Sequence, residues 1–475
     1  MRIVPAPRIR NVDSAAQLTS VSGARDSRRS DRMQVKLTRH AKPYGVLRAW
    51  PVPKRGPSIA DLARVAGNYL RVFAGTTGRL ILQAAYFLVL TNTLGLAEMG
   101  SFAAASAIGI MIGAFSGFGF SAIAFQAAAS RQRLLGRYFG IFLVGSAITL
   151  PIGLLLSAPF YFAIFKGALP LHTFMMIMIV EIFMFRLIEG LHKINNGLGR
   201  FTVASLVFIL QSASRAAAAV LFAASGGGNL DSWVDIYFIA NGLATLAAFA
   251  LFGARVRIRW DTKLFIARFR DAVLFAFSSL TFDAQTEVDK VVFLVIAGDR
   301  AAGIYAISIR IIELAIIPVR TFFVLYSRKL IRERRHDSIV SRNLLIEGSI
   351  FAATVGAYGV FLALLSLKPN VLGANVEVAR QLFGMALLVP AFRSMMELHS
   401  ELYFAYRKLG TQAVVTLLLV ALKAAMIAAM VSTSADPAGW GYSLNWIFAA
   451  LYLLSAVAVY RAIGATPPRP TGSFA

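Results

Sequence analysis

The sequence has no cysteine, few histidines and few charged residues. Among 475 residues there are five His and no Cys, which excludes disulfides, thiolate metal sites and cysteine nucleophiles, and a histidine-rich metal site is not expected. Charged residues make up 15% of the chain, against about 25% in soluble proteins, and 57% of the residues are hydrophobic. The composition excludes an ordinary soluble enzyme, and we predict neither a cofactor nor a metal.

Acidic residues are scarce relative to basic ones. The chain has 48 Lys and Arg but 23 Asp and Glu, a formal net charge of +25. In a soluble protein this excess would suggest nucleic acid, but here its position matters more, and no nucleic-acid partner is predicted. Residues 1–64 are basic and lack the apolar region of a secretory signal, so we expect a disordered cytoplasmic tail on anionic headgroups. Initiation at Met33 is an alternative explanation of this segment.

Long apolar runs recur through the rest of the chain. We count about twelve, and dividing the remaining length by twelve leaves room for a helix of about 20 residues and a short loop each. The predicted fold is an all-α polytopic membrane protein of about twelve transmembrane helices, for which the family resemblance described below implies two pseudo-symmetric six-helix bundles around a central cavity. The predicted organisation is an N-terminal tail (1–64), a first bundle (65–254), a cytoplasmic linker (255–271), a second bundle (272–463) and a cytoplasmic C-terminal tail (464–475).

The loop charges support this count independently. Basic residues fill alternate connections, such as the one containing Arg131, Arg133 and Arg137, whereas the intervening connections contain little more than Lys166, Arg300 and a few others. Positively charged loops stay on the cytoplasmic side of a membrane. The alternation therefore predicts an even number of spans with both termini in the cytoplasm.

An internal repeat relates the two predicted bundles. Residues 94–102, which join the first two spans, match residues 297–305, which join the seventh and eighth, in two glycines and a final aromatic residue. The offset of roughly 200 residues places the first six spans on the last six in the same orientation. Parallel halves of this kind are typical of transporters.

The stretch from Val288-Asp289-Lys290-Val291 through Ala302-Gly303-Ile304-Tyr305 to Pro318 resembles the polysaccharide and O-antigen flippases. These lipid-linked oligosaccharide flippases belong to the multidrug, oligosaccharidyl-lipid and polysaccharide exporter superfamily. The earlier turn at residues 94–102 is similar to the same family's first outer turn, and the likeness in span number, loop length and repeat covers about residues 65–463. The resemblance implies a bacterial inner-membrane protein rather than an enzyme.

The resemblance also implies a cargo and partners. The cargo would be a polyprenyl-pyrophosphate-linked oligosaccharide, moved from the cytoplasmic to the periplasmic leaflet by alternating access for exopolysaccharide or lipopolysaccharide assembly. A polysaccharide polymerase and a chain-length regulator would be its protein partners. Membrane lipids would surround the helices.

Charges inside the apolar spans are the candidate functional residues, because a charge at bilayer depth costs about 2.5 to 3.5 kcal/mol on insertion scales and normally faces a partner or a watery cavity. Three pairs, Arg186 with Glu189, Glu287 with Lys290 and Arg310 with Glu313, are three residues apart, and Arg393 lies four before Glu397, so each pair shares a helix face. Other cations have no acid at these spacings: Arg79, Arg215, Arg320 and Lys423.

Cations from both bundles suit an anionic ligand, and pyrophosphate fits because its oxygens accept paired hydrogen bonds from guanidinium groups. The predicted substrate-binding residues are Arg79, Arg215, Arg320, Lys423, Arg310 and Arg393. The predicted coupling or gate residues are Asp283, Glu287, Asp289, Lys290, Glu313 and Glu397. The competing interpretation is that these cations pair with carboxylates of other helices, such as Glu181, Asp283, Asp289 or Glu401, or extend toward headgroups.

Other functions and other roles for small residues compete with this prediction. A multidrug or cation antiporter of the same superfamily would present a cavity dominated by acids. A membrane glycosyltransferase or polysaccharide polymerase would need a sizeable outer loop, and the predicted outer loops are short. A stripe of small residues at Ala105, Gly109, Gly113 and Gly117 is expected to let another helix approach closely.

Overall fold

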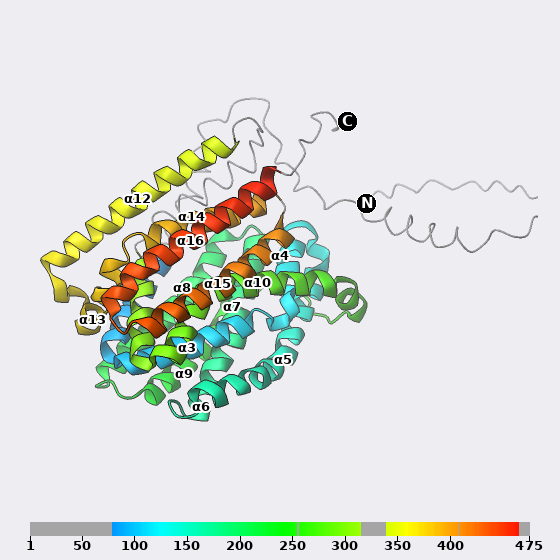
Figure 1. The fold of residues 1–475 in the computed structure, drawn as a ribbon. Helices are drawn as coiled ribbons and strands as arrows, with labels where there is room; N and C mark the ends of the chain where they lie inside the picture. The colour runs from blue at the N-terminus through cyan, green and yellow to red at the C-terminus, as the bar shows by residue number, and fades with distance from the viewer. Residues whose placement is uncertain (1–77, 254–255, 315–338, 407, 465–475) are drawn as a thin grey trace, which may run out of the picture. The chain divides into compact units, whose positions relative to one another are not determined.

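The computed structural model describes residues 78–253, 256–314, 339–406 and 408–464 (Figure 1). Within these ranges every regular element is helical and there is no strand. The first part comprises helical residues 78–93 and the helices α3 (Leu96–Gly113), α4 (Phe120–Ser130), α5 (Leu135–Phe160), α6 (Leu171–Ile179), α7 (Phe185–Gly197), α8 (Phe201–Ala224) and α9 (Leu230–Phe252). The second part comprises α10 (Thr262–Ala297), helical residues 299–314, α12 (Ile339–Leu367), α13 (Ala374–Met385), α14 (Val389–Ala405), α15 (Leu409–Thr433) and α16 (Pro437–Gly464).

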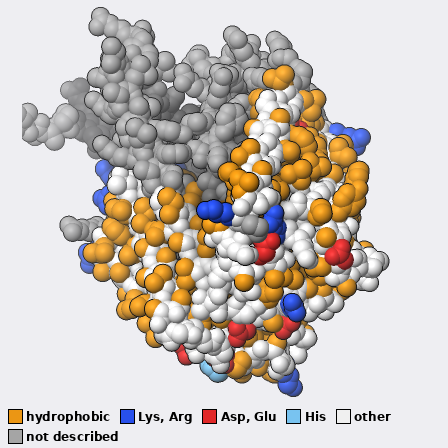
Figure 2. Space-filling model, turned by 90° about the vertical axis from the view of Figure 1, so that its left-hand side faces the viewer, with side chains coloured by type: hydrophobic (Ala, Val, Ile, Leu, Met, Phe, Trp, Pro, Cys, Tyr) orange, Lys and Arg blue, Asp and Glu red, His pale blue; other side chains and the backbone are white. Residues whose placement is uncertain are grey.

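Eight helical segments of the described residues are long and apolar enough to cross a bilayer. Large apolar side chains are exposed along them, such as Leu155 on α5 at 74% and Leu246 on α9 at 70%. Figure 2 shows apolar side chains over much of one face, with the charged ones in small mixed groups. The predicted all-α, multi-pass membrane fold is confirmed.

Polar caps and glycines mark the ends of several helices. The Asn229 side chain accepts a hydrogen bond from the Ser232 amide at the start of α9, and Asp261 accepts one from Leu264 at the start of α10. Gly298, with φ +85°, ends α10 in a conformation that side chains disfavour. Because α10 begins at Thr262, the part of the expected linker from there onward is helical.

The second predicted span is broken rather than continuous. α3 and α4 are separated by a 3₁₀ turn at Ser116–Gly119, where Gly117 (φ +61°) and Gly119 (φ +80°) take left-handed conformations. A Cβ on Gly119 would lie 2.2 Å from the Ala272 carbonyl oxygen of α10, so glycine is required at this position for two reasons.

The small-residue stripe on α3 serves helix packing, as expected. A Cβ on Gly109 would lie 2.8 Å from the Glu181 Cβ, and one on Gly113 would lie 2.9 Å from the Arg186 Nε. Glu181 belongs to a π-helical turn, Val180–Met184, between α6 and α7. Because Gly109 and Gly113 have no side chains, Glu181 of this turn and Arg186 of α7 can pack closely against α3.

The two glycines of the repeat meet each other. A Cβ on Gly100 would lie 1.9 Å from the Asp299 carbonyl oxygen, and one on Gly303 would lie 1.9 Å from the Leu96 carbonyl oxygen, so α3 and helix 299–314 touch through their backbones. The Asn375 side chain adds hydrogen bonds to the Thr91 carbonyl (2.7 Å) and the Leu94 carbonyl (2.9 Å). We call this contact, formed by residues 91–100, 298–303 and 372–375, the closed end. The two parts of the chain are sealed against each other there.

Candidate functional site

Glu313 holds two arginines of the second part. Its carboxylate accepts from Arg310 Nη1 at 2.9 Å and from Arg393 Nη2 at 2.6 Å. Arg310 lies one turn earlier on helix 299–314, as its spacing predicted, and Arg393 comes from α14. Arg393 was expected to pair with Glu397, whose charge does act on it, and it also donates a hydrogen bond to Glu313 of another helix. Arg310 therefore shares its carboxylate with a second guanidinium group.

The Arg310 guanidinium is the accessible member of this group. Its side chain is 51% exposed, whereas that of Arg393 is 10% exposed. Besides Glu313, the groups that act on Arg310 are Glu287 of α10 and Tyr86 of helix 78–93. Because these flanking groups come from both parts of the chain, Arg310 lies near the boundary between the two parts.

Arg215 of α8 is the corresponding cation of the first part. Its Nε donates to the Asn241 side chain at 2.9 Å, and its Nη2 forms an ion pair with Glu181 Oε1 at 3.9 Å, one of the predicted alternatives, without a hydrogen bond to any described residue. The Tyr237 ring lies below its guanidinium, 5.1 Å from the ring centre. Arg215 is thus placed by an amide and a ring, with one buried N–H group left to donate.

Tyr86 is within electrostatic reach of both cations. Both Arg215 and Arg310 act electrostatically on its hydroxyl, although they belong to different parts of the chain. Glu181 also acts there, but its Oε1 already accepts from the Tyr237 hydroxyl at 2.6 Å and from Ser106 at 3.3 Å. Arg215 and Arg310 are therefore both within electrostatic reach of Tyr86, and their role in binding an anion stays a prediction.

Lys423 of α15 has a protein partner. Its Nζ lies 3.1 Å from Asp289 Oδ2 on α10 and also donates to the Gln285 carbonyl, and the Tyr305 hydroxyl donates to the same Asp289 oxygen. The expectation that this lysine is left unneutralised is wrong, and pairing with Asp289 was one of the alternatives. A role for Lys423 in substrate binding stays a prediction.

Asp283 and Glu287 of α10 contact different cations, although they share a helix face. Asp283 accepts from Arg186 Nη2 at 2.6 Å, and Glu287 accepts from Lys290 at 2.5 Å. Arg186 also binds Glu189 at 2.8 Å, which in turn binds Lys193 at 2.7 Å. The two predicted pairs of neighbouring residues therefore form, and Asp283 joins one of them from another helix.

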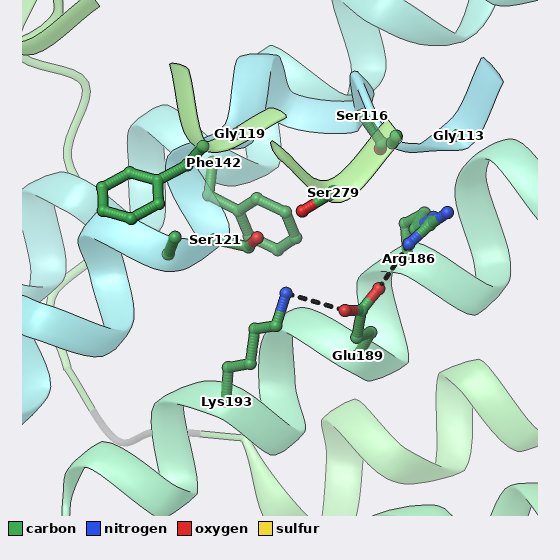
Figure 3. A pocket seen from close by; sticks show the side chains of 12 residues that line it. Gly113, Ser116, Gly119, Ser121, Phe142, Arg186, Glu189, Lys193 and Ser279 are labelled. Atoms are coloured by element: carbon green, nitrogen blue, oxygen red, sulfur yellow. Dashed lines mark hydrogen bonds and ion pairs between the residues drawn. The ribbon is translucent and has the colours of Figure 1, made fainter. Parts of the chain in front are cut away.

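A small cavity of about 20 Å³, room for about one water molecule, lies at the break between α3 and α4. Figure 3 shows the chain of Arg186, Glu189 and Lys193 along one wall, with Ser121 and Ser279 opposite. Since each charge in this wall has an opposite partner, the cavity presents hydroxyl groups and a balanced set of charges. It is less suited to a multiply charged anion than the Arg215 and Arg310 region.

Two of the predicted binding residues add little to this geometry. The Arg79 guanidinium lies 4.3 Å from the centre of the Phe208 ring of α8, a cation–π contact. Arg320 lies outside the described residues. The proposed roles of both stay predictions.

One buried charged group was not anticipated. Glu347 of α12 and His399 of α14 are in contact inside the second part, and their side chains are 2% and 1% exposed. Each lies on a helix of the membrane-spanning second part, and an ionisable residue at membrane depth is a functional candidate by default. Applying that rule to these two residues would have found them.

The basic connection before α10 contains a titratable group outside the membrane-spanning segments. The Leu264 amide and Arg137, whose Nη1 lies 2.9 Å from the Asp261 carboxylate, hold the pKa of that carboxyl below its usual range. Within the described residues no cluster of three or more histidines and acids could hold a metal ion. The chemistry on offer in the interior is therefore that of arginines, carboxylates and hydroxyls.

Comparison with known proteins places the chain in a family. The family of polysaccharide biosynthesis proteins matches residues 66–324, more than half of the chain. No curated protein sequence matches. The sequence match includes helix 299–314 and α10, which contain Arg310, Glu313 and the paired acids described above.

Solved structures share the fold at low sequence identity. An inward-facing multidrug resistance MATE family transporter of the MOP superfamily superimposes with a TM-score of 0.62 at 13% identity, covering 82% of this chain and 96% of that one. A second MATE multidrug transporter, solved in complex with a ligand, gives 0.60 at 14% identity, covering 86% and 97%. A MOP superfamily transporter from Pyrococcus furiosus gives 0.52 at 14%, covering 82% and 92%. The chain has the MATE-like transporter fold.

Proposed function

The chain belongs to the family of polysaccharide biosynthesis proteins, and we propose that it is a flippase that moves a polyprenyl-pyrophosphate-linked oligosaccharide from the cytoplasmic to the periplasmic leaflet of a bacterial inner membrane. Its product would serve exopolysaccharide or lipopolysaccharide assembly. The family match supports the role in polysaccharide synthesis, and the transporter fold supports translocation over catalysis.

The placement of Arg215 and Arg310 around Tyr86 supports this proposal. Both act on Tyr86 from different parts of the chain, Arg310 is half exposed, and the Arg215 Nη2, although 3.9 Å from Glu181, makes no hydrogen bond to a described residue. Guanidinium groups offer planar paired donors that match phosphate oxygens. A pyrophosphate between them would draw together the two parts that the closed end already joins on one side.

The Glu313 carboxylate limits how tightly Arg310 can bind an anion. Glu313 bonds both Arg310 and Arg393, so an incoming phosphate competes with a carboxylate for Arg310 instead of meeting a bare cation. Such competition favours release as well as binding, which a carrier needs. Predicted binding roles for Arg79, Arg320 and Lys423 are part of the same proposal, as are gate roles for Asp283, Glu287, Asp289, Lys290, Glu313 and Glu397.

Membrane potential favours the proposed direction. Moving a doubly negative anion outward across a membrane that is negative inside is downhill by about 4.6 kcal/mol at roughly 100 mV, since each charge contributes about 2.3. We place the closed end on the periplasmic side, because the basic connections lie at the opposite end of the spans.

Flipping in proteoliposomes tests the function. A fluorescent polyprenyl-pyrophosphate-linked disaccharide should cross the bilayer faster with the protein present, and Arg310→Gln or Arg215→Gln should slow it at least tenfold. Arg380→Gln is the matched control, because Arg380 makes the same three-residue pair, with Glu377 at 3.2 Å, away from the proposed site. Equal rates in all three variants would refute the assignment of the site.

The antiporter alternative is tested in the same vesicles. The acids of the interior, such as Glu181 and Asp289, each bind hydroxyls or cations of the protein itself, which disfavours a cationic cargo. A cationic rhodamine dye should therefore not be transported. Dye transport without lipid flipping would replace the flippase proposal with the antiporter.

A further inference from the structure

A buried carboxylate and imidazole join three helices of the second part. Glu347 lies on α12, His399 on α14, and their contact is covered by α16. The carboxylate oxygen Oε1 and the ring nitrogen Nε2 are 3.2 Å apart. Apolar side chains enclose the pair: Ile350, Met395, Leu398, Leu402 and Val459.

Three donors converge on the Glu347 carboxylate. The Tyr452 hydroxyl donates to Oε2 at 2.6 Å, the Tyr460 hydroxyl donates to Oε1, and His399 contacts Oε1 through Nε2. The other ring nitrogen of His399 lies 2.8 Å from the Ser455 hydroxyl. Both carboxylate oxygens and both ring nitrogens are thus occupied.

This arrangement suits a proton and not a metal ion. A cation such as sodium needs free oxygen lone pairs arranged around it, whereas both oxygens of Glu347 already accept hydrogen bonds. With one proton between them, Glu347 and His399 are either both uncharged or carry opposite charges in contact. The net charge of the pair is zero in both cases. Removing that proton would leave an uncompensated negative charge in an apolar enclosure, which is costly.

Few other charged groups of the described chain reach this pair. The groups that act most strongly on Glu347 are His399, Tyr452 and Tyr460. Glu397 and Glu401 are further titratable residues of α14, on either side of His399 in the sequence. The proton balance of the enclosure is therefore set chiefly by Glu347 and His399.

Helix α14 connects this pair to the proposed anion site. Arg393, which binds Glu313, precedes His399 by six residues on α14, a rise of about 9 Å along a helix. A shift of α14 that exposed His399 to water would also move Arg393 relative to Glu313. The shared helix gives the two sites a direct mechanical connection.

We propose that Glu347 and His399 form a proton-binding site, which holds one proton while buried and exchanges it with water when α12, α14 and α16 separate. The proton taken from one aqueous phase is released to the other, so proton movement is tied to the change between conformations. The coupling to cargo rests on the proposed function, whereas the proton site itself does not.

The absence of cysteine allows a direct test on the full chain. Spin labels at Leu171→Cys and Val371→Cys, which are 46% and 65% exposed, would report the distance across the closed end. The distance distribution should change between pH 5 and pH 8.5. Glu347→Gln and His399→Gln should each abolish this change, and His192→Gln, a histidine of α7 that bonds the Ala204 carbonyl, should retain it.

Tyr452→Phe keeps the test decisive if the other variants fail to fold. It removes one donor to the carboxylate, so the midpoint of the pH response should move to higher pH by about one unit. A parent protein insensitive to pH would overturn the proton site, as would variants that keep the parent's midpoint. Lipid flipping without any pH response would leave the proposed function standing, and a pH response without flipping would leave the proton site alone standing.

Discussion

Replacing Gly100 with alanine should open the closed end. The added Cβ would lie 1.9 Å from the Asp299 carbonyl oxygen and 2.6 Å from the Gly303 nitrogen, while close carbon–oxygen contacts are about 3.3 Å or longer. The two helices must therefore separate by roughly 1.4 Å at this point. Neither neighbour is a flexible side chain, because both atoms are backbone.

The expected cost follows from this overlap. Inserting a methyl group into a packed contact costs about 1 to 3 kcal/mol. The cost falls on the closed conformation alone, so the ratio of closed to open molecules should drop about 5- to 150-fold. Gly303→Ala should act in the same way, because its Cβ would meet the Leu96 carbonyl oxygen at the same distance.

Cysteine labelling measures this change. Thr91→Cys places a thiol at a position that is fully buried at the closed end, and the Thr91 hydroxyl bonds no group of the described residues. A membrane-impermeant maleimide should label it faster in Gly100→Ala than in the parent. Gly356→Ala, where no atom lies within 4 Å of the new Cβ, is the control that should label at the parent's rate.

One result would refute the reasoning. If folded Gly100→Ala protein labels no faster than the parent, either the contact adapts at no cost or it does not open. Lipid flipping measured on the same sample separates these outcomes. Flipping at the parent's rate by a protein whose contact never opens would show that opening of this contact is not needed for transport.

Two further predictions concern charged contacts. Asp289→Asn leaves buried Lys423 without its carboxylate, so the free energy of unfolding measured in detergent should fall by about 3 to 5 kcal/mol. Combining Asp289→Asn with Lys423→Met should restore most of this loss. An unchanged unfolding temperature in the single variant would contradict the pairing. The pKa of Asp261 is lowered in the folded protein, so its stabilisation of the start of α10 is present above the ordinary value of 3.8 and is lost as the pH falls through the folded value. Hydrogen exchange at the Leu264 amide should therefore stay slow from pH 7 to pH 5 after correction for the intrinsic rate and quicken below about pH 4, whereas Asp261→Ala should exchange quickly throughout.

Much of the architecture follows from periodicity and composition. Apolar runs separated by charged loops predict the helical membrane fold, because the bilayer sets the length of each span. The pairs Arg186 with Glu189, Glu287 with Lys290 and Arg310 with Glu313 follow from the helical repeat alone. The repeat at Gly100 and Gly303 was also visible, but nothing local to either glycine indicated that the two would touch.

Partners on different helices required the folded chain. Lys423 and Asp289 are 134 residues apart, Arg393 and Glu313 are 80 apart, and His399 and Glu347 are 52 apart. An apolar helix can rotate or slide against several neighbours at similar cost, so its sequence does not say which charge it will face. Packing of backbones at glycine contacts selects one arrangement, and that choice determines which carboxylates Lys423, Arg393 and Arg215 contact.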